Sequence, residues 1–237
     1  MKKKQQLFTS AVIVAAGRGS RMNMDRNKQF IDIGGKPVLA WTIQTFQECN
    51  RIKEIVVVVS EQEVMYCKQN IIDFYGFQKV KTIAVGGKER QESVYNGLKE
   101  IDSECEIVLI HDGARPFVKE ESILNSISTA QEYGAACVGV PVKDTIKRVD
   151  EQGFIKKTLD RSTLWAVQTP QTFKYDLIMH AHREATKWDF KGTDDAVLVE
   201  RLGASTKFVM GSYDNIKITT KEDLAVAEEI LSRREEL

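Results

Sequence analysis

Short runs of apolar residues recur along the chain, and longer segments with apolar residues at helical spacing separate them. The runs are rich in Val and Ile, and their apolar residues are consecutive rather than alternating, which is typical of parallel strands covered on both faces. The runs that predict strands lie at residues 11–16, 54–60, 81–85, 106–112, 135–142 and 205–211.

The segments between these runs predict amphipathic helices. Pro37 suits a first helical turn, and Gly76 and Gly134 can cap two of the helices. The helices are predicted at residues 37–49, 61–76, 90–101, 119–134, 174–187 and 193–203, with a last one from about residue 221. This alternation predicts a three-layer, doubly wound α/β fold with a mostly parallel, Rossmann-like sheet.

The alternation lapses between Lys143 and Gln171, where β-branched residues and a turn signal at 151–153 replace any helical pattern. We predict a protruding β-arm at about 143–163, followed by a return strand. The chain shows no internal repeat or linker. Residues 1–237 are therefore expected to form a single domain that carries this arm.

Composition narrows the function classes. The chain has 34 Lys and Arg against 34 Asp and Glu, so no overall field attracts nucleic acid or a membrane, and any anion site must be local. Its four cysteines are far apart, which predicts free thiols in a reducing cytosol. The first apolar run is too short for a secretory signal, and no segment approaches the ~20 apolar residues of a membrane span. We expect a soluble, cytoplasmic protein.

The first predicted strand runs into a glycine loop, "AAGRGSRM" at 15–22. The dinucleotide-binding fingerprint needs a third glycine where this chain has Met22, and an acidic residue where the next strand ends in Ser60. These differences disfavour a nicotinamide-dependent oxidoreductase. The GxxxxGK[ST] pattern of a P-loop is also missing.

A different phosphate-binding loop explains the same residues. Gly17 and Gly19 would expose backbone N–H groups, and Arg21 and Lys28 follow as cations, which suits a triphosphate. Taken alone, the loop is equally consistent with a solvated basic turn.

Six further segments decide between these interpretations. They are "GGKERQESVYNGL" (86–98), "HDGARPF" (111–117), "VPVKDTIKR" (140–148), "LWAVQTPQTF" (164–173), "GTDDA" (192–196) and "DNIKITTKEDLAVAE" (214–228). With the glycine loop, they resemble the 2-C-methyl-D-erythritol 4-phosphate cytidylyltransferase family over nearly the whole chain. The ribitol-5-phosphate cytidylyltransferases share several of these segments, but the run at 140–148 favours the erythritol enzymes.

The resemblance implies a nucleotidyltransferase fold and the transfer of CMP from CTP to 2-C-methyl-D-erythritol 4-phosphate. The products would be 4-diphosphocytidyl-2-C-methyl-D-erythritol and pyrophosphate. A phosphate monoester is already anionic at neutral pH, so cations and positioning matter more than a general base. The alternatives are ribitol 5-phosphate as acceptor and, more remotely, a non-catalytic nucleotide-binding module.

The resemblance also assigns residues. The catalytic cations would be Arg21, Lys28 and Lys217, and the nucleotide would contact Ala15, Ala16, Gly17, Gly19, Gly87 and Ser93. From spacing alone, Lys217 would be a surface lysine that shares one face of an edge strand with Asn215.

The acceptor would meet Arg115, Thr145, Arg161, Thr169 and Thr193. In the family the arms interlock in a homodimer, so the partner subunit supplies part of this set. The residues alone leave Arg161 equally well an exposed side chain of the arm.

Asp112 ends a strongly apolar strand, at the edge where open α/β sheets bind ligands. The carboxylate could cap a loop or helix. With a nucleotide present it would hold Mg²⁺ or another divalent cation, which takes one or two carboxylates and keeps several waters. Asp214 is a second, weaker metal candidate, and His111 is expected to be structural.

Overall fold

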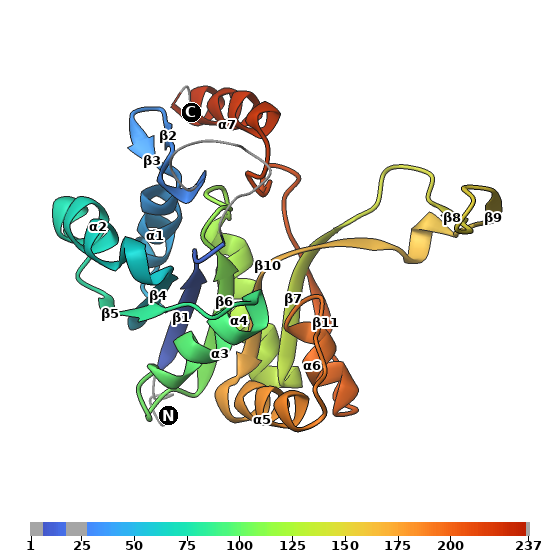
Figure 1. Ribbon diagram of the computed structural model, residues 1–237, viewed down its shortest axis with the longest axis horizontal. Helices are drawn as coiled ribbons and strands as arrows, with labels where there is room; N and C mark the ends of the chain where they lie inside the picture. Colours follow the sequence, from blue (N-terminus) through green and yellow to red (C-terminus); the bar gives the residue numbers. More distant parts are fainter. Residues whose placement is uncertain (1–6, 18–27, 236–237) are drawn as a thin grey trace, which may run out of the picture.

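The computed structural model describes residues 7–17 and 28–235. Within these residues, seven strands form the central sheet in the order β11-β7-β10-β6-β1-β4-β5 (Figure 1). The strands are β1 (Thr9–Val14), β4 (Glu54–Val59), β5 (Val80–Val85), β6 (Ile107–Asp112), β7 (Ala135–Pro141), β10 (Trp165–Lys174) and β11 (Lys207–Met210). β10 runs antiparallel to β6 and β7, and the other neighbouring pairs are parallel.

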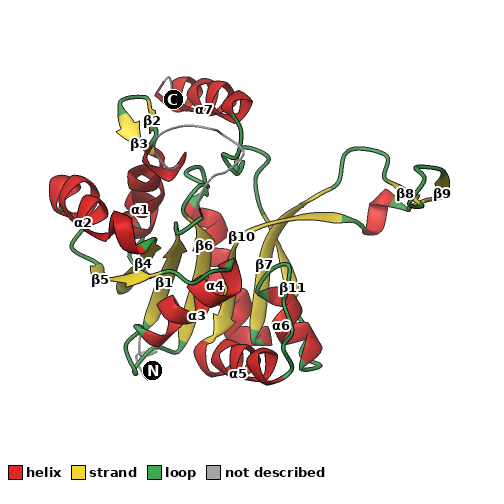
Figure 2. Ribbon diagram, viewed as in Figure 1, coloured by secondary structure: helices red, strands yellow, loops and turns green. Residues whose placement is uncertain are grey.

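Helices cover both faces of the sheet (Figure 2). One face packs against α1 (Val38–Glu48), α4 (Glu120–Tyr133) and a helical segment of mixed geometry at residues 61–73, which contains α2 (Val64–Cys67). The other face packs against α3 (Arg90–Lys99), α5 (Tyr175–Lys187) and α6 (Ala196–Arg201). The predicted three-layer α/β fold is therefore what the structure shows.

The alternation of side chains along β1 explains the two cores. Ala11 and Ile13 point to the face covered by α1 and α4, whereas Val12 between them points to the face covered by α3. All three are fully buried. A strand buried on both faces has no polar side, which is why these runs are apolar throughout.

The chain after β11 differs from the prediction. Residues 211–220 form no strand, so the edge strand expected to carry Asn215 and Lys217 is wrong. The Ile218 N–H donates to the carbonyl of Ala114 at 2.9 Å, and its side chain enters a third apolar cluster. That cluster joins Val38 of α1 to the closing helix α7 (Lys221–Glu235). A neighbouring hairpin, β2 (Asp32–Ile33) and β3 (Lys36–Pro37), places Pro37 just before α1 rather than inside its first turn.

The chain between β7 and β10 contains a second hairpin. β8 (Lys147–Val149) and β9 (Ile155–Thr158) form an antiparallel hairpin that stands away from the sheet (Figure 1). Gly153, with φ +86°, lies in its turn, and all the residues of both strands are exposed. The long return strand β10 then re-enters the sheet between β6 and β7.

Two further expectations can be compared with the structure. The four cysteines, which lie at positions 49, 67, 105 and 137, are buried free thiols. No helix within residues 7–17 and 28–235 has the length and apolar character needed to cross a membrane.

Candidate active site

A pocket of about 1190 Å³ opens at the carboxyl ends of the parallel strands. Residues 14–17, 60–62 and 85–90, at the ends of β1, β4 and β5 and in the loops that follow, line the pocket. The lining is completed by Gln29, Glu92, Ser93, Asp112, Ala114 and Lys217. Open α/β sheets bind ligands at this edge because the strands end there and their loops diverge. Seven residues predicted as site residues line this pocket: Ala15, Ala16, Gly17, Gly87, Ser93, Asp112 and Lys217.

The loops after β1 and β5 pack tightly against each other. A Cβ at Gly86 would collide with the Cβ of Ala16, so only glycine allows this approach. The Ser93 hydroxyl accepts a hydrogen bond from the Gly87 N–H at 3.0 Å and donates to the carbonyl of Glu89, also at 3.0 Å. These contacts fix the loop between β5 and α3 before any ligand binds.

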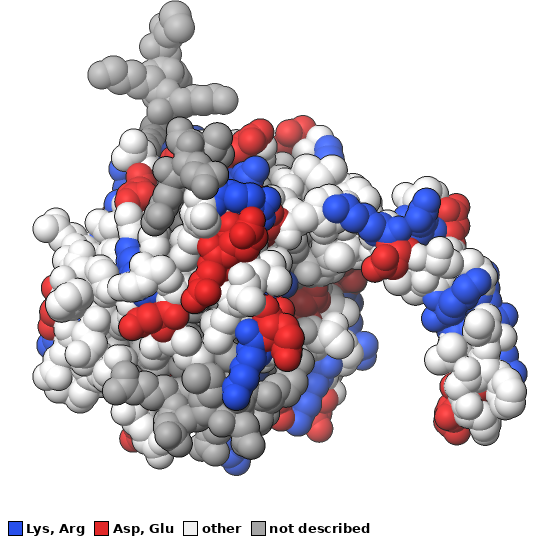
Figure 3. Space-filling model, turned by 90° about the horizontal axis from the view of Figure 1, so that it is seen from above, with Lys and Arg blue, Asp and Glu red and all other residues white. Residues whose placement is uncertain are grey.

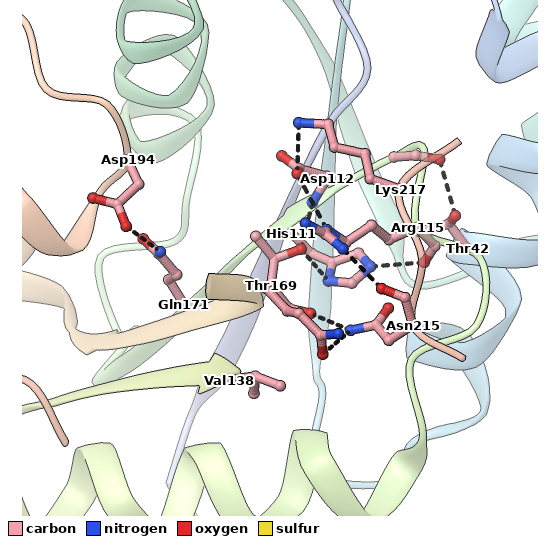
Figure 4. A network of polar contacts seen from close by, with 12 residues as sticks. Thr42, His111, Asp112, Arg115, Val138, Thr169, Gln171, Asp194, Asn215 and Lys217 are labelled. Atoms are coloured by element: carbon pink, nitrogen blue, oxygen red, sulfur yellow. Dashed lines mark hydrogen bonds and ion pairs between the residues drawn. The ribbon is translucent and has the colours of Figure 1, made fainter. Parts of the chain in front are cut away.

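Asp112 lies at the centre of a cluster of cations at the end of β6 (Figure 4). Its Oδ2 is 2.9 Å from the Lys217 ammonium and 3.5 Å from Nε of Arg115, and its Oδ1 is 3.3 Å from Nε of Arg90. Burial raises the pKa of the Asp112 carboxyl, but the three cations outweigh it and hold that pKa well below its usual range. Asp112 is therefore ionised at neutral pH.

His111 connects Asp112 to its neighbours. Thr169 Oγ1 accepts from the Asp112 N–H at 3.1 Å and lies 3.0 Å from His111 Nδ1, while His111 Nε2 lies 3.0 Å from the carbonyl of Arg115. Burial lowers the pKa of His111 to about 4, so the ring is neutral near pH 7. The contacts suit the Nε2–H tautomer, in which Nδ1 accepts the Thr169 proton. His111 thus has the structural place expected for it.

Asn215 anchors the segment that carries Lys217. Its amide nitrogen donates to the carbonyl of Thr169 at 2.9 Å and to Oε1 of Gln168 at 3.2 Å. The backbone carbonyl of Asn215 accepts a hydrogen bond from Nη1 of Arg115 at 2.7 Å. These bonds hold Arg115 and the backbone next to Lys217 against the middle of β10.

Other predicted residues lie elsewhere. Thr145 and Arg161 are exposed on the arm, where Arg161 donates to the carbonyl of Lys143 at 2.8 Å. Thr193 is exposed before α6 and does not line the pocket. Asp214 lies 3.7 Å from Arg233 and is likewise absent from the pocket lining. Gly19 and Arg21, and the side chain of Lys28, lie outside the described part of the chain.

Sequence reasoning missed Arg90 and the anchoring role of Asn215. Both lie inside motifs that the sequence singles out, "GGKER" and "DNIKIT". The motifs did not reveal that Arg90 contacts Asp112, 22 residues away, and Asp195, 105 residues away.

The residues present fit a divalent cation held by a single carboxylate. Among the described residues, no three or more His, Cys, Asp or Glu side chains gather into a metal cluster. Mg²⁺ in nucleotide enzymes needs no such cluster, because one or two carboxylates, the phosphates and water hold it. Asp112, a buried and ionised carboxylate on the pocket wall, has the required chemistry.

The fold and the pocket define a nucleotidyltransferase, and comparisons with known proteins agree. A family model described as 2-C-methyl-D-erythritol 4-phosphate cytidylyltransferase matches residues 9–233. The chain belongs to this cytidylyltransferase family.

Curated relatives and solved structures support this assignment. A 2-C-methyl-D-erythritol 4-phosphate cytidylyltransferase of Caldanaerobacter subterraneus is 56% identical over 224 residues, covering 94% of this chain and 99% of the relative. One from Clostridioides difficile is 56% identical over 223 residues, with 94% and 93% covered. The structure of a 4-diphosphocytidyl-2C-methyl-D-erythritol synthase from Anaerococcus prevotii superposes with a TM-score of 0.86 at 35% identity, covering 96% of this chain and 97% of that one. The predicted fold and enzyme class are confirmed.

Proposed function

We propose that this enzyme transfers CMP from CTP to 2-C-methyl-D-erythritol 4-phosphate, forming 4-diphosphocytidyl-2-C-methyl-D-erythritol and pyrophosphate in isoprenoid precursor synthesis. The observation that carries the proposal is the Lys217–Asp112 pair on the wall of a nucleotide-sized pocket, in a chain that matches this family almost end to end.

The reaction needs charge stabilisation more than proton transfer. An oxygen of the acceptor phosphate forms a bond to the α-phosphorus of CTP, and the bond from that phosphorus to pyrophosphate breaks. The electron pair leaves with pyrophosphate, and no proton has to move. Lys217, whose side chain is 38% exposed, can turn from Asp112 toward the α-phosphate. Arg21 and Lys28 would hold the leaving pyrophosphate.

The glycine loops would bind the nucleoside. The loop after β1, with Ala15, Ala16 and Gly17, and the loop after β5, with Gly87 and Ser93, both line the pocket and would offer backbone groups to the base. Hydrogen bonds from such groups can identify the edge of a base without charged side chains. Gly19 would add a backbone N–H to the phosphates.

We assign the metal site to Asp112. A divalent cation bound there would neutralise charge on the triphosphate. To bind the metal, one oxygen of Asp112 has to lose its contact with a cationic side chain. We expect Lys217 to be that side chain, because the transfer step also requires its ammonium at the α-phosphate. Asp214 is the weaker candidate because it pairs with Arg233 away from the pocket.

The acceptor half of the site would be completed by a second subunit. Arg115 and Thr169 lie beside Asp112, whereas Thr145 and Arg161 are on the arm. Three large apolar residues are exposed on the hairpin: Val149, Phe154 and Ile155. An exposed apolar tip favours an interface. We therefore propose a homodimer in which one single-domain chain lends its arm to the pocket of the other, with Thr193 at the rim.

An acceptor comparison tests the function. Pyrophosphate release with CTP and Mg²⁺ is measured with 2-C-methyl-D-erythritol 4-phosphate and, separately, with ribitol 5-phosphate. ATP and UTP replace CTP as controls. We expect release only with CTP, and faster with the erythritol phosphate. Faster release with ribitol phosphate would change the acceptor, and no release with either would refute the proposal.

A further inference from the structure

Arg90 lies between two carboxylates. Its Nε is 3.3 Å from Oδ1 of Asp112 on the pocket wall, and its Nη1 is 2.8 Å from Oδ2 of Asp195 behind the pocket. The Asp195 side chain is only 1% exposed. A buried carboxylate needs a charged partner, and a neutral His182 ring 3.9 Å away does not supply one. Arg90 is thus the cation that Asp195 requires.

The sheet fixes Asp195 in place. The backbone N–H groups of Asp195 and Ala196 donate to Oε1 of Gln171, at 3.0 and 2.9 Å. Gln171 is fully buried on β10, and its amide nitrogen donates to Asp194 at 2.8 Å (Figure 4). Because these bonds hold the backbone on both sides of the carboxylate, Asp195 cannot follow Arg90 if that side chain moves.

The two contacts of Arg90 compete for one positive charge. The guanidinium is closer to Asp195 than to Asp112, so the negative charge of Asp195 offsets more of its positive charge than that of Asp112 does. Arg90 therefore weakens the negative potential at Asp112 less, and Asp112 attracts a cation that arrives with the nucleotide more strongly. Without Asp195, the full charge of Arg90 would face Asp112 and compete with that cation.

We infer that Asp195 is a positioning residue that preserves the divalent-cation affinity of Asp112 by holding Arg90 against the back of the pocket. The inference rests on the proposed assignment of the metal to Asp112. It links the "GTDDA" segment to the nucleotide, although that segment does not line the pocket.

The test is the factor by which Mg²⁺ tightens CTP binding. Titration calorimetry gives the dissociation constant of CTP with Mg²⁺ and with EDTA, in the absence of acceptor, so no turnover is involved. For Asp195→Asn we expect this factor to fall roughly 10–100-fold, the usual effect of losing a residue that supports a metal ligand. In the double variant Asp195→Asn with Arg90→Gln, both charges are removed, and the factor should recover toward that of the wild type.

A purely structural role gives a different result. Asp195→Asn would then lower the melting temperature and leave the Mg²⁺ factor unchanged, or the double variant would bind no better than the single one. Either result overturns the inference. Lys187→Gln, which removes the charge of an exposed ion pair with Glu184 on α5, is the matched control and should keep the wild-type factor. If Mg²⁺ does not tighten CTP binding to the wild type, the metal assignment itself fails, and the inference fails with it.

Discussion

The pocket and the arm differ in the surroundings of their charged side chains. At the pocket, charged side chains such as Asp112 and Arg90 are held by partners within the same chain. On the arm, the strands β8 and β9 are exposed on every residue, and the charged side chains lie on the surface (Figure 3), where even the ion pair between Lys156 and Asp150 is open to solvent. A buried charge without a partner is costly, whereas an exposed one is not. One chain must therefore supply the partners of the buried charges at the pocket, whereas the exposed residues of the arm are free to serve a second chain, as proposed above.

The predicted acceptor residues divide along the same line. Arg115 and Thr169 belong to the hydrogen-bonded cluster around Asp112, and Thr145 and Arg161 belong to the arm. On the proposed assignment, one chain would supply the described part of the nucleotide half, whereas the acceptor half would combine Arg115 and Thr169 of that chain with the arm of a second one.

The largest effect is expected at the pocket. Lys217→Ala should lower kcat by roughly 10²–10³-fold, since it removes a cation aimed at the charge that develops in the transition state. Pyrophosphate release measures this, and CTP binding should change much less. Lys221→Ala, at the exposed start of α7, is the control. A near wild-type kcat in Lys217→Ala would show that the pocket cations do not carry the chemistry.

A smaller effect is expected on the arm. Arg161→Ala should raise KM for the acceptor roughly 10-fold or more, the loss expected for one hydrogen bond to a charged group. The affinity for CTP should not change. Arg148→Ala, also exposed on the hairpin, is the matched control. Unchanged acceptor kinetics in Arg161→Ala would mean that the arm only joins subunits.

A smaller effect, on stability, is expected where the loops after β1 and β5 pack against each other. Gly86→Ala should lower the free energy of unfolding by about 1–3 kcal/mol, because its Cβ collides with Ala16. Urea denaturation measures the change. Gly17→Ala is the stability control, since no atom of the described residues lies within 4 Å of the added Cβ. Equal stability of the two variants would contradict the close approach of the loops.

The smallest effect concerns pH. Burial lowers the pKa of His182, so the folded chain holds this ring neutral while the unfolded chain protonates it near pH 6.5. The free energy of unfolding should therefore fall as pH drops below about 6.5, before the carboxylates titrate. His182→Gln should reduce this slope, whereas Arg148→Ala on the arm should not. An unchanged slope in His182→Gln would show that burial does not hold this ring neutral.

Much of this could be predicted from the sequence, for physical reasons. Continuous apolar runs such as 55–59 are required of strands covered on both faces, so the sequence could predict the α/β fold. The edge strand expected at Asn215 and Lys217 was wrong because Ile218 buries against α7 and its backbone bonds to Ala114, not to a strand. Alternating apolar residues indicate a buried face without saying what covers it.

The site was predicted only in part. Asp112 could be found because it ends an apolar strand at the ligand-binding edge. The role of Arg90 could not, since its second partner, Asp195, is 105 residues away and meets it only after folding. Long-range charge pairs leave no local pattern in a single sequence.

Subunit mixing tests the contrast between pocket and arm most directly. Lys217→Ala chains, which lack a pocket cation, are unfolded, mixed with Arg161→Ala chains and refolded together. If the arm serves the pocket of its partner, a mixed dimer has one site with both defects and one intact site. Random pairing should then restore about a quarter of wild-type activity. At limiting acceptor, Lys217→Ala alone should be nearly inactive, and Arg161→Ala alone should keep about a tenth of the activity or less. No activity above the separate variants would contradict the account, because Arg161 would then act on the pocket of its own chain.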